Sequence, residues 1–407
     1  MNTPVDYDLV IVGGGVVGAA LACRLADTTL QVAMIDAHAF NDHTQPHDDD
    51  RTLALSYSTR LLLEELGVWS ALSASAEPIH TVHVSEKGRF GTCQLRQQDA
   101  GTPALGYVVE ARQLDRIMLE RLQSQENVDL LSATRVTALS QTHTEVDLAV
   151  STTDGHLSAI RCRLLVAADG SHSSIRKMTG VHAKHTDYRQ TAIITVAQTE
   201  RPHQNMAYER FTPQGPLAIL PMQDGQCSIV MTVDTADEAI LSSTDTEFIQ
   251  TLHAQFGYRL GRFLSIGKRT AFPLYLVQSE TQFTGRIVFI GNARRSLHPV
   301  GGQGFNLALR DVDALATCLL ENAPHQFGNS TQLTRFTQMR QSDQSRTTYL
   351  TDGLARLFKE GVEWLGPMRA LGLISLDFSP WARKKFARQM MGMHHFSHDK
   401  HDTKLLP

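Results

Sequence analysis

Three glycines near the start of the chain have the spacing of a ligand-binding turn. Gly13-x-Gly15-x-x-Gly18 follows the apolar run YDLVIV and opens a helical pattern. In such a turn the first glycine permits the tight bend, the second lets the backbone approach a pyrophosphate, and the third lets helix and strand pack closely. Asp36 ends the next apolar run, where a carboxylate can accept hydrogen bonds from ribose hydroxyls. The pattern predicts a dinucleotide site; a glycine-rich turn without a ligand is the alternative.

A second glycine cluster lies far along the chain, in the stretch FIGNARRSLHPVGGQGFNLALRD. An apolar run over residues 286–290 ends just before Asn292, and Gly302, Gln303 and Gly304 then precede a helical pattern. Glycines between a strand and a helix indicate that the backbone approaches a ligand. A nicotinamide dehydrogenase needs one such fingerprint, so a second one favours a different cofactor.

A third stretch, LLVAADGSHSSIRK, places Asp169 and Gly170 at the end of an apolar run. An Asp-Gly pair alone is a common turn. Its position after one strand, before a Ser-Ser-Ile-Arg sequence and between the two glycine clusters makes it a further candidate for the ligand site.

These motifs, GxGxxG, DG and a counterpart of GD, resemble in kind and order those of the class A flavoprotein aromatic hydroxylases. The resemblance covers nearly the whole chain. The stretches DDDRTLALS, YERFTPQGPLAILPM and LHPVGGQGFNLALRD are similar to the ubiquinone-biosynthesis hydroxylases, above all to those that act on 2-octaprenyl-6-methoxyphenol. The resemblance implies FAD as the cofactor and NAD(P)H as the co-substrate.

The resemblance also assigns residues to the cofactor: Gly13, Gly15, Gly18, Asp36, Arg51, Arg112, Asp169, Asn292, Gly302, Gln303 and Gly304. The first three glycines would hold the FAD pyrophosphate and Asp36, where the family more often has Glu, the adenosine ribose. Arg51 would lie near the flavin and its phosphates, and Arg112 on a helix that contacts FAD. Asp169 would serve both FAD and NAD(P)H.

The remaining assignments concern the flavin half of the cofactor. Gly302, Gln303 and Gly304 match the loop beside the isoalloxazine ring. Asn292 stands where most of the family has an aspartate that bonds a ribityl hydroxyl. An amide oxygen can accept the same bond, but it brings no negative charge.

The implied reaction is hydroxylation of the ring of a polyprenylated phenol in ubiquinone biosynthesis. NAD(P)H would reduce FAD, and a flavin C4a-hydroperoxide would deliver one oxygen atom. No side-chain nucleophile is required, so no catalytic residue is assigned; His298 is either an acid–base group or structural. Other ubiquinone-biosynthesis proteins are expected as partners. Two alternatives stay open: a catabolic hydroxylase of small phenols or salicylate, and a non-catalytic flavoprotein subunit of a quinone-making assembly.

The elements that must position these residues form a discontinuous arrangement. Residues 1–75, 106–182 and 280–330 are predicted to form a Rossmann-like α/β FAD-binding domain. Residues 76–105 and 183–279 read as an inserted antiparallel-sheet substrate domain, because residues 188–234 alternate with a period of two. Residues 331–407 are predicted to form a helical C-terminal region. The stretch from 47 to 59, which contains LALS, is predicted to be polar and then helical.

Composition narrows the class further. The chain has 407 residues, with 42% hydrophobic and 20% charged, and a net charge of -4, which gives no general attraction to nucleic acid. It shows no signal-peptide pattern and no apolar run of the ~20 residues that a spanning helix needs. The 18 histidines form no HExxH pair, so no metal is expected. We expect a cytoplasmic protein.

The C-terminal stretch SPWARKKFARQMMG mixes four cations with aromatic and apolar residues. This short basic amphipathic pattern suits peripheral contact with an anionic membrane surface, here the inner membrane, or with a partner protein. An ordinary surface helix that packs on the core would show the same pattern.

Overall fold

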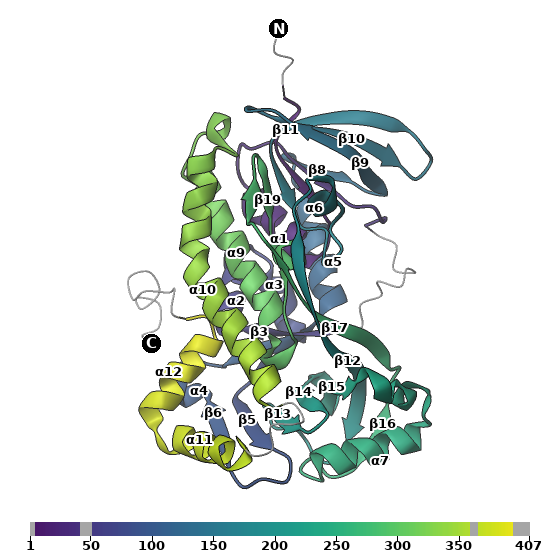
Figure 1. The fold of residues 1–407 in the computed structure, drawn as a ribbon, viewed down its shortest axis with the longest axis vertical. Helices are drawn as coiled ribbons and strands as arrows, with labels where there is room; N and C mark the ends of the chain where they lie inside the picture. The colour runs from purple at the N-terminus through teal and green to yellow at the C-terminus, as the bar shows by residue number, and fades with distance from the viewer. Residues whose placement is uncertain (1–4, 41–50, 359–364, 394–407) are drawn as a thin grey trace.

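The computed structural model describes residues 5–40, 51–358 and 365–393. Two large sheets stand end to end, with long helices along one side and two shorter helices at the lower end (Figure 1). Strands β12 (Ala183–Thr199) and β17 (Thr270–Ser279) run from the junction into the lower sheet. The predicted α/β fold with a helical C-terminal region is confirmed for the described residues; residues 359–364 and 394–407 of that region lie outside them.

Sheet A has a parallel centre. Its strands are β1 (Tyr7–Val12), β2 (Val32–Ile35), β8 (Val128–Leu131), β9 (Thr134–Gln141), β10 (Val146–Thr152), β11 (Leu157–Ala167), β18 (Phe283–Thr284) and β19 (Ile287–Phe289). The order β19-β11-β1-β2-β8 is parallel throughout. Central parallel strands are covered on both faces, which is why their sequences are nearly all apolar.

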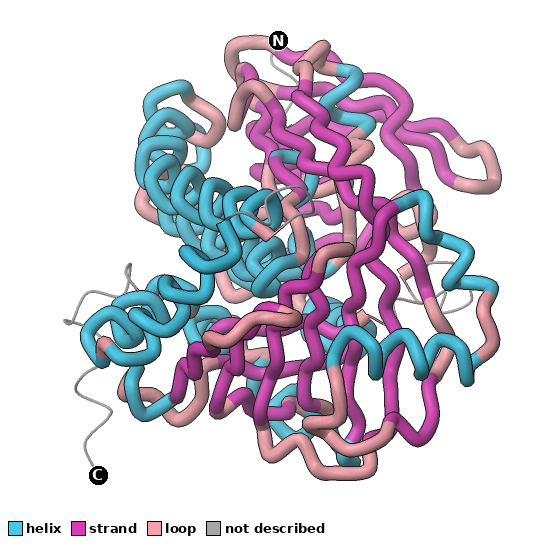
Figure 2. The backbone as a smooth tube through the Cα atoms, turned by 60° about the horizontal axis from the view of Figure 1, so that its bottom comes forward, coloured by secondary structure: helices cyan, strands magenta, loops and turns pink. Residues whose placement is uncertain are grey.

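Side chains of β1 point alternately to the two faces of sheet A, and their contacts show what covers each face. Leu9 and Ile11 pack into the cluster formed by α1 (Val16–Leu25), α5 (Ala111–Gln123) and α9 (Gln303–Leu320). Val10 and Val12 point the other way and join the cluster that includes the β9–β10 pair. Sheet A therefore has helices on one face and a β-hairpin on the other (Figure 2).

Sheet C is mainly antiparallel and forms the lower half of the molecule. Its strands are β5 (Thr81–Glu86), β6 (Thr92–Arg96), β12, β13 (Met206–Thr212), β14 (Gly215–Pro221), β15 (Gln226–Asp234), β16 (Phe263–Ile266), β17 and β20 (Arg295–Ser296). Helix α7 (Asp245–Phe256) covers its outer face with Phe248, Leu252 and Phe256. A capping box between Thr244 and Glu247 fixes where this helix begins.

One sequence-based prediction is wrong. The stretch LALS does not form a helix: residues Thr52–Ser56 are strand β3, which pairs antiparallel with β7 (Gly106–Glu110) in sheet B, beside β4 (Glu77–Ile79). Pairing with a strand fifty residues away overrides the helix propensity of Leu and Ala. Helix α2 (Tyr57–Glu65) begins only at Tyr57, after the Ser56 hydroxyl accepts a hydrogen bond from the Thr59 N–H.

A buried ion network joins α9 to α10 (Ser330–Leu357). Arg310 pairs with Asp343 at 2.8 Å, and Arg340 pairs with Asp311 at 2.6 Å and with Asp343 at 2.5 Å. These side chains are at most 6% exposed. Buried charges persist only when their partners are in place, so the network fixes how α10 lies along α9.

The last two helices, α11 (Gly366–Phe378) and α12 (Pro380–Met390), close one end of the molecule against β5, β6 and the short α4 (Gln97–Ala100). Arg383 of α12 pairs with Asp99 of α4 at 3.1 Å. The other short helices and helical turns are α3 (Trp69–Leu72), α6 (Ser174–Met178), α8 (Gly291–Arg294), η1 (Ser73–Ser75), η2 (Gln223–Gly225), η3 (Thr235–Ser242), η4 (Val300–Gly302) and η5 (Pro324–Gln326).

Candidate functional site

The three sequence motifs meet at one edge of sheet A. Strands β1, β11 and β19 are parallel neighbours, with Val12 opposite Ala167 and Ala167 opposite Phe289. Their carboxyl ends are therefore level, and each is followed directly by one motif. Ligands of open α/β sheets bind at this edge. Motifs that are hundreds of residues apart in the sequence thus become adjacent loops.

The three early glycines have different neighbours. A Cβ on Gly13, whose φ is +109°, would lie 2.5 Å from the Ala168 carbonyl oxygen, and a Cβ on Gly18 would overlap the Gly13 carbonyl. At both positions the protein's own backbone leaves no room for a side chain. A Cβ on Gly15 would meet nothing within 4 Å. Gly15, at the N-terminus of α1, is the position where the turn leaves room for another molecule.

The two acidic residues of these loops bond their own backbone. Asp36 accepts from the N–H of Gly14 at 2.6 Å and from that of His38 at 2.8 Å. Asp169 accepts from the N–H of Ser174 at 2.7 Å and of Ile175 at 3.1 Å, at the start of α6. Each carboxylate therefore shapes its loop in the structure, while its remaining lone pairs can still accept from a ligand.

An arginine connects the loop after β11 to the loop after β19. Arg176 is 4% exposed and donates to the carbonyl oxygens of Ala293 and Ser171, both at 2.7 Å. Ala293 belongs to α8, next to Asn292, and the Asn292 side chain is exposed with no hydrogen bond to the described part of the chain. The asparagine does not cap the local turn, and its amide is available to a ligand.

A cavity of about 990 Å³ connects this edge to the face of sheet C. The predicted residues that line it are Gly15, Arg51, Asn292, Gly302, Gln303 and Gly304. The predicted residues that lie outside its lining are Gly13, Gly18, Asp36, Arg112 and Asp169. Arg51 holds its guanidinium 5.0 Å from the Phe272 ring centroid. Arg112 is 58% exposed and pairs with Glu110 at 2.8 Å.

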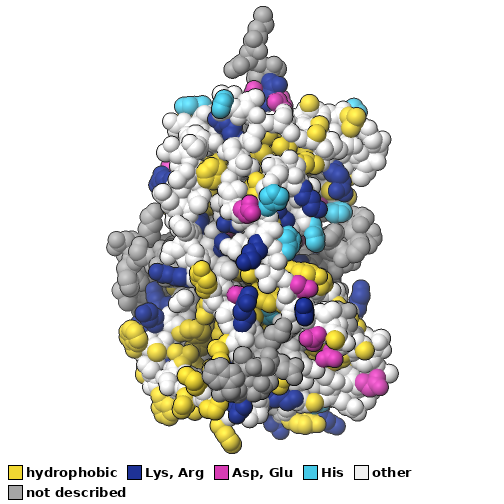
Figure 3. All heavy atoms as spheres, in the orientation of Figure 1, with side chains coloured by type: hydrophobic (Ala, Val, Ile, Leu, Met, Phe, Trp, Pro, Cys, Tyr) yellow, Lys and Arg dark blue, Asp and Glu magenta, His cyan; other side chains and the backbone are white. Residues whose placement is uncertain are grey.

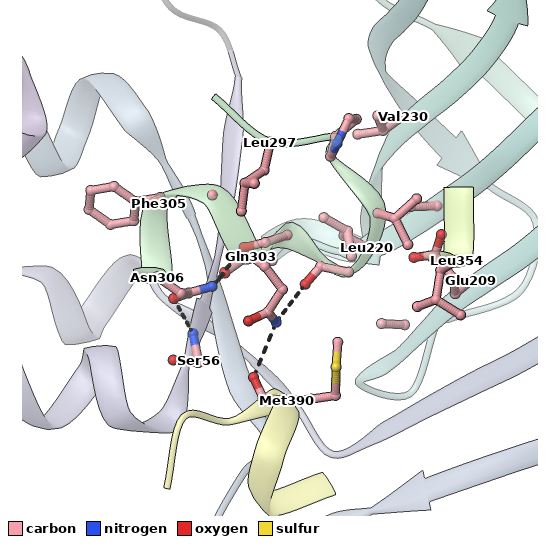
Figure 4. Close-up of a pocket in the computed structure, with 18 of the residues that line it drawn as sticks. Ser56, Glu209, Leu220, Val230, Leu297, Gln303, Phe305, Asn306, Leu354 and Met390 are labelled. Atoms are coloured by element: carbon pink, nitrogen blue, oxygen red, sulfur yellow. Dashed lines mark hydrogen bonds between the residues drawn. The ribbon is translucent and has the colours of Figure 1, made fainter. Parts of the chain in front are cut away.

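The second glycine cluster forms a shaped loop at the start of α9. Gly301 and Gly302 both have left-handed backbone conformations, with φ of +66° and +60°. The Gln303 amide nitrogen donates to the Gly301 carbonyl at 3.0 Å and to the Met390 carbonyl at 3.1 Å (Figure 4). The N-terminal end of α9 carries partial positive charge toward the cavity. This end can stabilise an anionic group bound there.

Sequence reasoning missed Asn306, which holds this loop in place. Its side chain is 1% exposed and uses both polar atoms (Figure 4). The oxygen accepts from the Ser56 N–H at 2.8 Å and the Thr59 hydroxyl at 2.7 Å. The nitrogen donates to the carbonyls of Ala54 at 2.8 Å and Gly302 at 2.7 Å. The available signal was a polar residue in an otherwise apolar helical run.

His298 lies in the protein interior, behind the lining of the cavity. It is 1% exposed, does not line the cavity, and accepts from the Val300 N–H at 3.3 Å. Burial lowers the pKa of its imidazole to about 4, so the ring is neutral near pH 7. The Tyr188 ring packs edge-on against it, with centroids 5.0 Å apart.

Comparison with known proteins defines the class. Residues 6–344 match the family described as FAD binding domain. The p-nitrophenol 4-monooxygenase of Pseudomonas putida DLL-E4 has the same fold, with a TM-score of 0.78 over 95% of this chain and 98% of that one, at 16% identity. The chain belongs to this FAD-binding family and has the fold of that monooxygenase.

Two curated relatives narrow the class. The ubiquinone hydroxylase UbiL of Rhodospirillum rubrum is 33% identical over 95% of this chain and 89% of its own length. The 3-demethoxyubiquinol 3-hydroxylase of Escherichia coli is 29% identical over 96% of this chain and all of its own length. The chain belongs to the ubiquinone-biosynthesis hydroxylases within the FAD-binding family.

The residues present fit FAD. The open position at Gly15, the available amide of Asn292 and the loop from Gly302 to Gly304 line one continuous cavity. Bound FAD would supply the redox chemistry, taking a hydride from NAD(P)H and activating dioxygen. The chain itself must hold and orient the cofactor and keep water from the reacting atoms. Among the described residues, no cluster of His, Cys, Asp and Glu could hold a metal ion.

Replacing Gly15 with valine tests the cofactor turn. Because a side chain there meets no protein atom within 4 Å, Gly15→Val should fold as the wild type does. FAD binding should weaken at least about tenfold, since about 1.4 kcal/mol of steric strain against the pyrophosphate is enough. Titration with FAD and a thermal melt of the FAD-free protein measure the two effects.

The matched control is Gly18→Ala, whose Cβ would overlap a backbone oxygen. This variant should lose stability even without FAD. Wild-type FAD affinity in Gly15→Val would show that the pyrophosphate does not lie at this turn.

Substitution of Asn292 tests the flavin end. A carboxylate roughly 10 Å from a reduced, anionic flavin costs about 1.7 kcal/mol at an effective dielectric of about 20. For a two-electron couple this is on the order of 30–40 mV. Asn292→Asp should therefore keep FAD and lower its midpoint potential by tens of millivolts. Asn292→Ala should weaken FAD binding by about 0.5–1.5 kcal/mol, through one lost hydrogen bond. Potentiometry and FAD titration separate the two; wild-type values in both variants would place the ribityl chain elsewhere.

Proposed function

We propose that the protein hydroxylates the aromatic ring of a polyprenylated phenol in ubiquinone biosynthesis, with a substrate of the 2-octaprenyl-6-methoxyphenol type. NAD(P)H and dioxygen are its co-substrates. The observation that carries the proposal is the continuous cavity, which extends from the cofactor turn past the loop at Gly302 to the two C-terminal helices. The names of the curated relatives support the same pathway.

The part of the cavity beyond the cofactor loops suits an apolar tail. Its wall is formed by side chains of sheet C and of α11 and α12, among them Ile194, Ala218, Leu220, Val230, Leu376 and Phe386. The cavity volume of about 990 Å³ is at the upper end of the roughly 300–1,000 Å³ that ligand pockets span, and it must hold the flavin as well as the substrate. A hydroxylase of small phenols would need room only for the flavin and one ring, so the apolar extension favours a prenylated substrate.

We also propose that the C-terminal helices contact an anionic membrane surface. Four apolar side chains are largely exposed there: Met368, Leu371, Phe378 and Trp381. Lys384 and Lys385 are exposed on the same pair of helices. Figure 3 shows hydrophobic side chains gathered at the end of the molecule where Figure 1 places α11 and α12. Met368 also lines the cavity, so the cavity meets the surface at this patch.

The structure shows that only some residues of the C-terminal basic amphipathic stretch are available to a membrane. Phe386, Met390 and Met391 line the cavity, and Arg383 is paired with Asp99. The membrane face therefore consists of the four exposed apolar residues and the two lysines. Within the described part of the chain, no helix has the length and apolar content needed to cross a bilayer.

A strain that lacks this gene tests the proposed reaction. Mass spectrometry should find less ubiquinone and an accumulated prenylated precursor that lacks one ring oxygen, and the structure of that precursor identifies the ring position. The wild-type gene should restore ubiquinone, whereas the Gly15→Val variant should not. Normal ubiquinone with no accumulated precursor would refute the proposal. If a variant without FAD restored ubiquinone, the protein would be a non-catalytic subunit. If the purified protein turned over small phenols with tight coupling, it would be a catabolic enzyme.

Co-sedimentation with phospholipid vesicles tests the membrane face. A double Lys384→Gln and Lys385→Gln variant should bind phosphatidylserine-containing vesicles about thirtyfold more weakly, because each lysine near such a surface contributes about 1 kcal/mol. The matched control neutralises Lys177 and Lys184, which are exposed on α6 and β12. Equal binding by wild type and both variants would exclude this face as a membrane contact.

A further inference from the structure

Strand β13 turns a single carboxylate toward the cavity. Ala207, Glu209 and Phe211 alternate along the strand and all line the cavity. Arg210, between them, points to the other face of sheet C, where it donates to the Gln255 carbonyl at 2.8 Å. Figure 4 shows Glu209 beside Leu354, on the same side of the pocket as Leu220 and Val230.

The surroundings of Glu209 are apolar. Its partners across the sheet are Ala218 on β14 and Val84 on β5. It is the one acidic residue among the described residues that line the cavity. Its Oε1 atom is enclosed and has no hydrogen-bond partner in the described part of the chain. A buried polar atom without a partner is costly, so a group that a ligand completes is the physical expectation.

We propose that Glu209 accepts the proton of the phenolic hydroxyl when the substrate is bound. This inference rests on the proposed function, because it needs a phenol in the cavity. The O–H bond of the phenol breaks, the proton passes to the carboxylate of Glu209, and the electron pair stays on the phenolate oxygen. No atom changes its oxidation state. The phenolate donates electron density into the ring, and this makes the ring a better target for an electrophilic oxygen.

The acid–base properties of Glu209 suit this role. Burial raises the pKa of its carboxyl to about 7, and the backbone N–H of Gly301 acts in the opposite direction. A phenol has a pKa of about 10 and an ordinary Glu one of about 4.3, so the raised value roughly halves the mismatch. Proton transfer is most efficient when the pKa of the base lies near the working pH.

The other charged groups around the cavity interact with partners other than Glu209. Arg369 on α11 pairs with Glu86 on β5, and Arg51 stacks over a phenylalanine ring. His83, also on β5, meets Arg259 at 2.9 Å and Tyr208 on the opposite face of the sheet. At the end of α10, Arg356 pairs with Asp352, and η4 carries no ionisable side chain. The protonation of Glu209 therefore follows its burial and the Gly301 N–H.

The Glu209→Gln variant tests proton transfer without changing the shape of the side chain. The amide keeps the size of the side chain and an acceptor for the Gly301 N–H, but it cannot take a proton. With a short-chain 2-prenyl-6-methoxyphenol as the probe, kcat should fall about a hundredfold or more, with little change in KM or FAD binding. The wild-type rate should rise with pH through about 7 as the carboxyl ionises, and the rate of the variant should be flat there. The control Glu64→Gln, exposed on α2 beside Arg60, should match the wild type.

A second readout needs no turnover. A carboxyl whose folded pKa is raised to about 7 destabilises the fold as pH rises from its unfolded value toward 7. The FAD-free wild type should therefore melt at a lower temperature than Glu209→Gln above pH 7, and the gap should close near pH 4. Equal melting curves at every pH would overturn the assignment of a raised pKa.

The outcomes distinguish this inference from the function on which it rests. If the wild type hydroxylates the probe and Glu209→Gln does so at the same rate with the same pH profile, the inference is wrong and the proposed function stands. If Glu209→Gln loses FAD, the residue holds the loop at Gly301 and the inference is again wrong. If the FAD-loaded wild type hydroxylates no phenol, the proposed function fails and the inference fails with it.

Discussion

The parallel register of β1, β11 and β19 is the constraint on which the site depends. Because neighbouring parallel strands end level, the loops after them must share one edge of sheet A. The loops then have little freedom: glycines at 13 and 18 are closed by backbone, and Arg176 ties the second loop to the third. One cavity can therefore serve a long cofactor whose two ends are recognised by distant parts of the sequence.

The loop before α9, on the substrate side of the cavity, is also held in place by hydrogen bonds within the chain. Asn306 uses all of its hydrogen-bonding capacity to fix β3, the start of α2 and the carbonyl of Gly302 relative to one another. A buried amide with every bond satisfied holds its neighbours rigidly, because each displaced partner would leave a polar group unpaired. The loop from Gly301 to Gly304 is thus positioned by elements from both halves of the chain before any ligand binds.

The sequence was sufficient for the local features and insufficient for those that depend on distant pairing. The glycine turn after β1, the strand–loop–helix at Asn292 and the antiparallel character of residues 188–234 follow from short patterns, and the family resemblance is confirmed. The strand at Thr52–Ser56 was missed because its partner, β7, lies about fifty residues later. Glu209 was missed because only the assembled sheet shows which face of β13 lines the cavity. The cofactor roles of all the assigned residues stay predictions: Gly13, Gly15, Gly18, Asp36, Arg51, Arg112, Asp169, Asn292, Gly302, Gln303 and Gly304.

The contact between Gln303 and Met390 has a consequence for how the protein is made. Gly15, early in the sequence, and α12, late in it, both line the cavity, and the Gln303 amide joins the loop before α9 to α12 through the Met390 carbonyl. Domains begin to fold during synthesis, N-terminal parts first. The cofactor turn can therefore form on the ribosome, whereas the flavin side of the cavity cannot close until α12 has emerged. A complete cavity is therefore expected only after α12 has been synthesised.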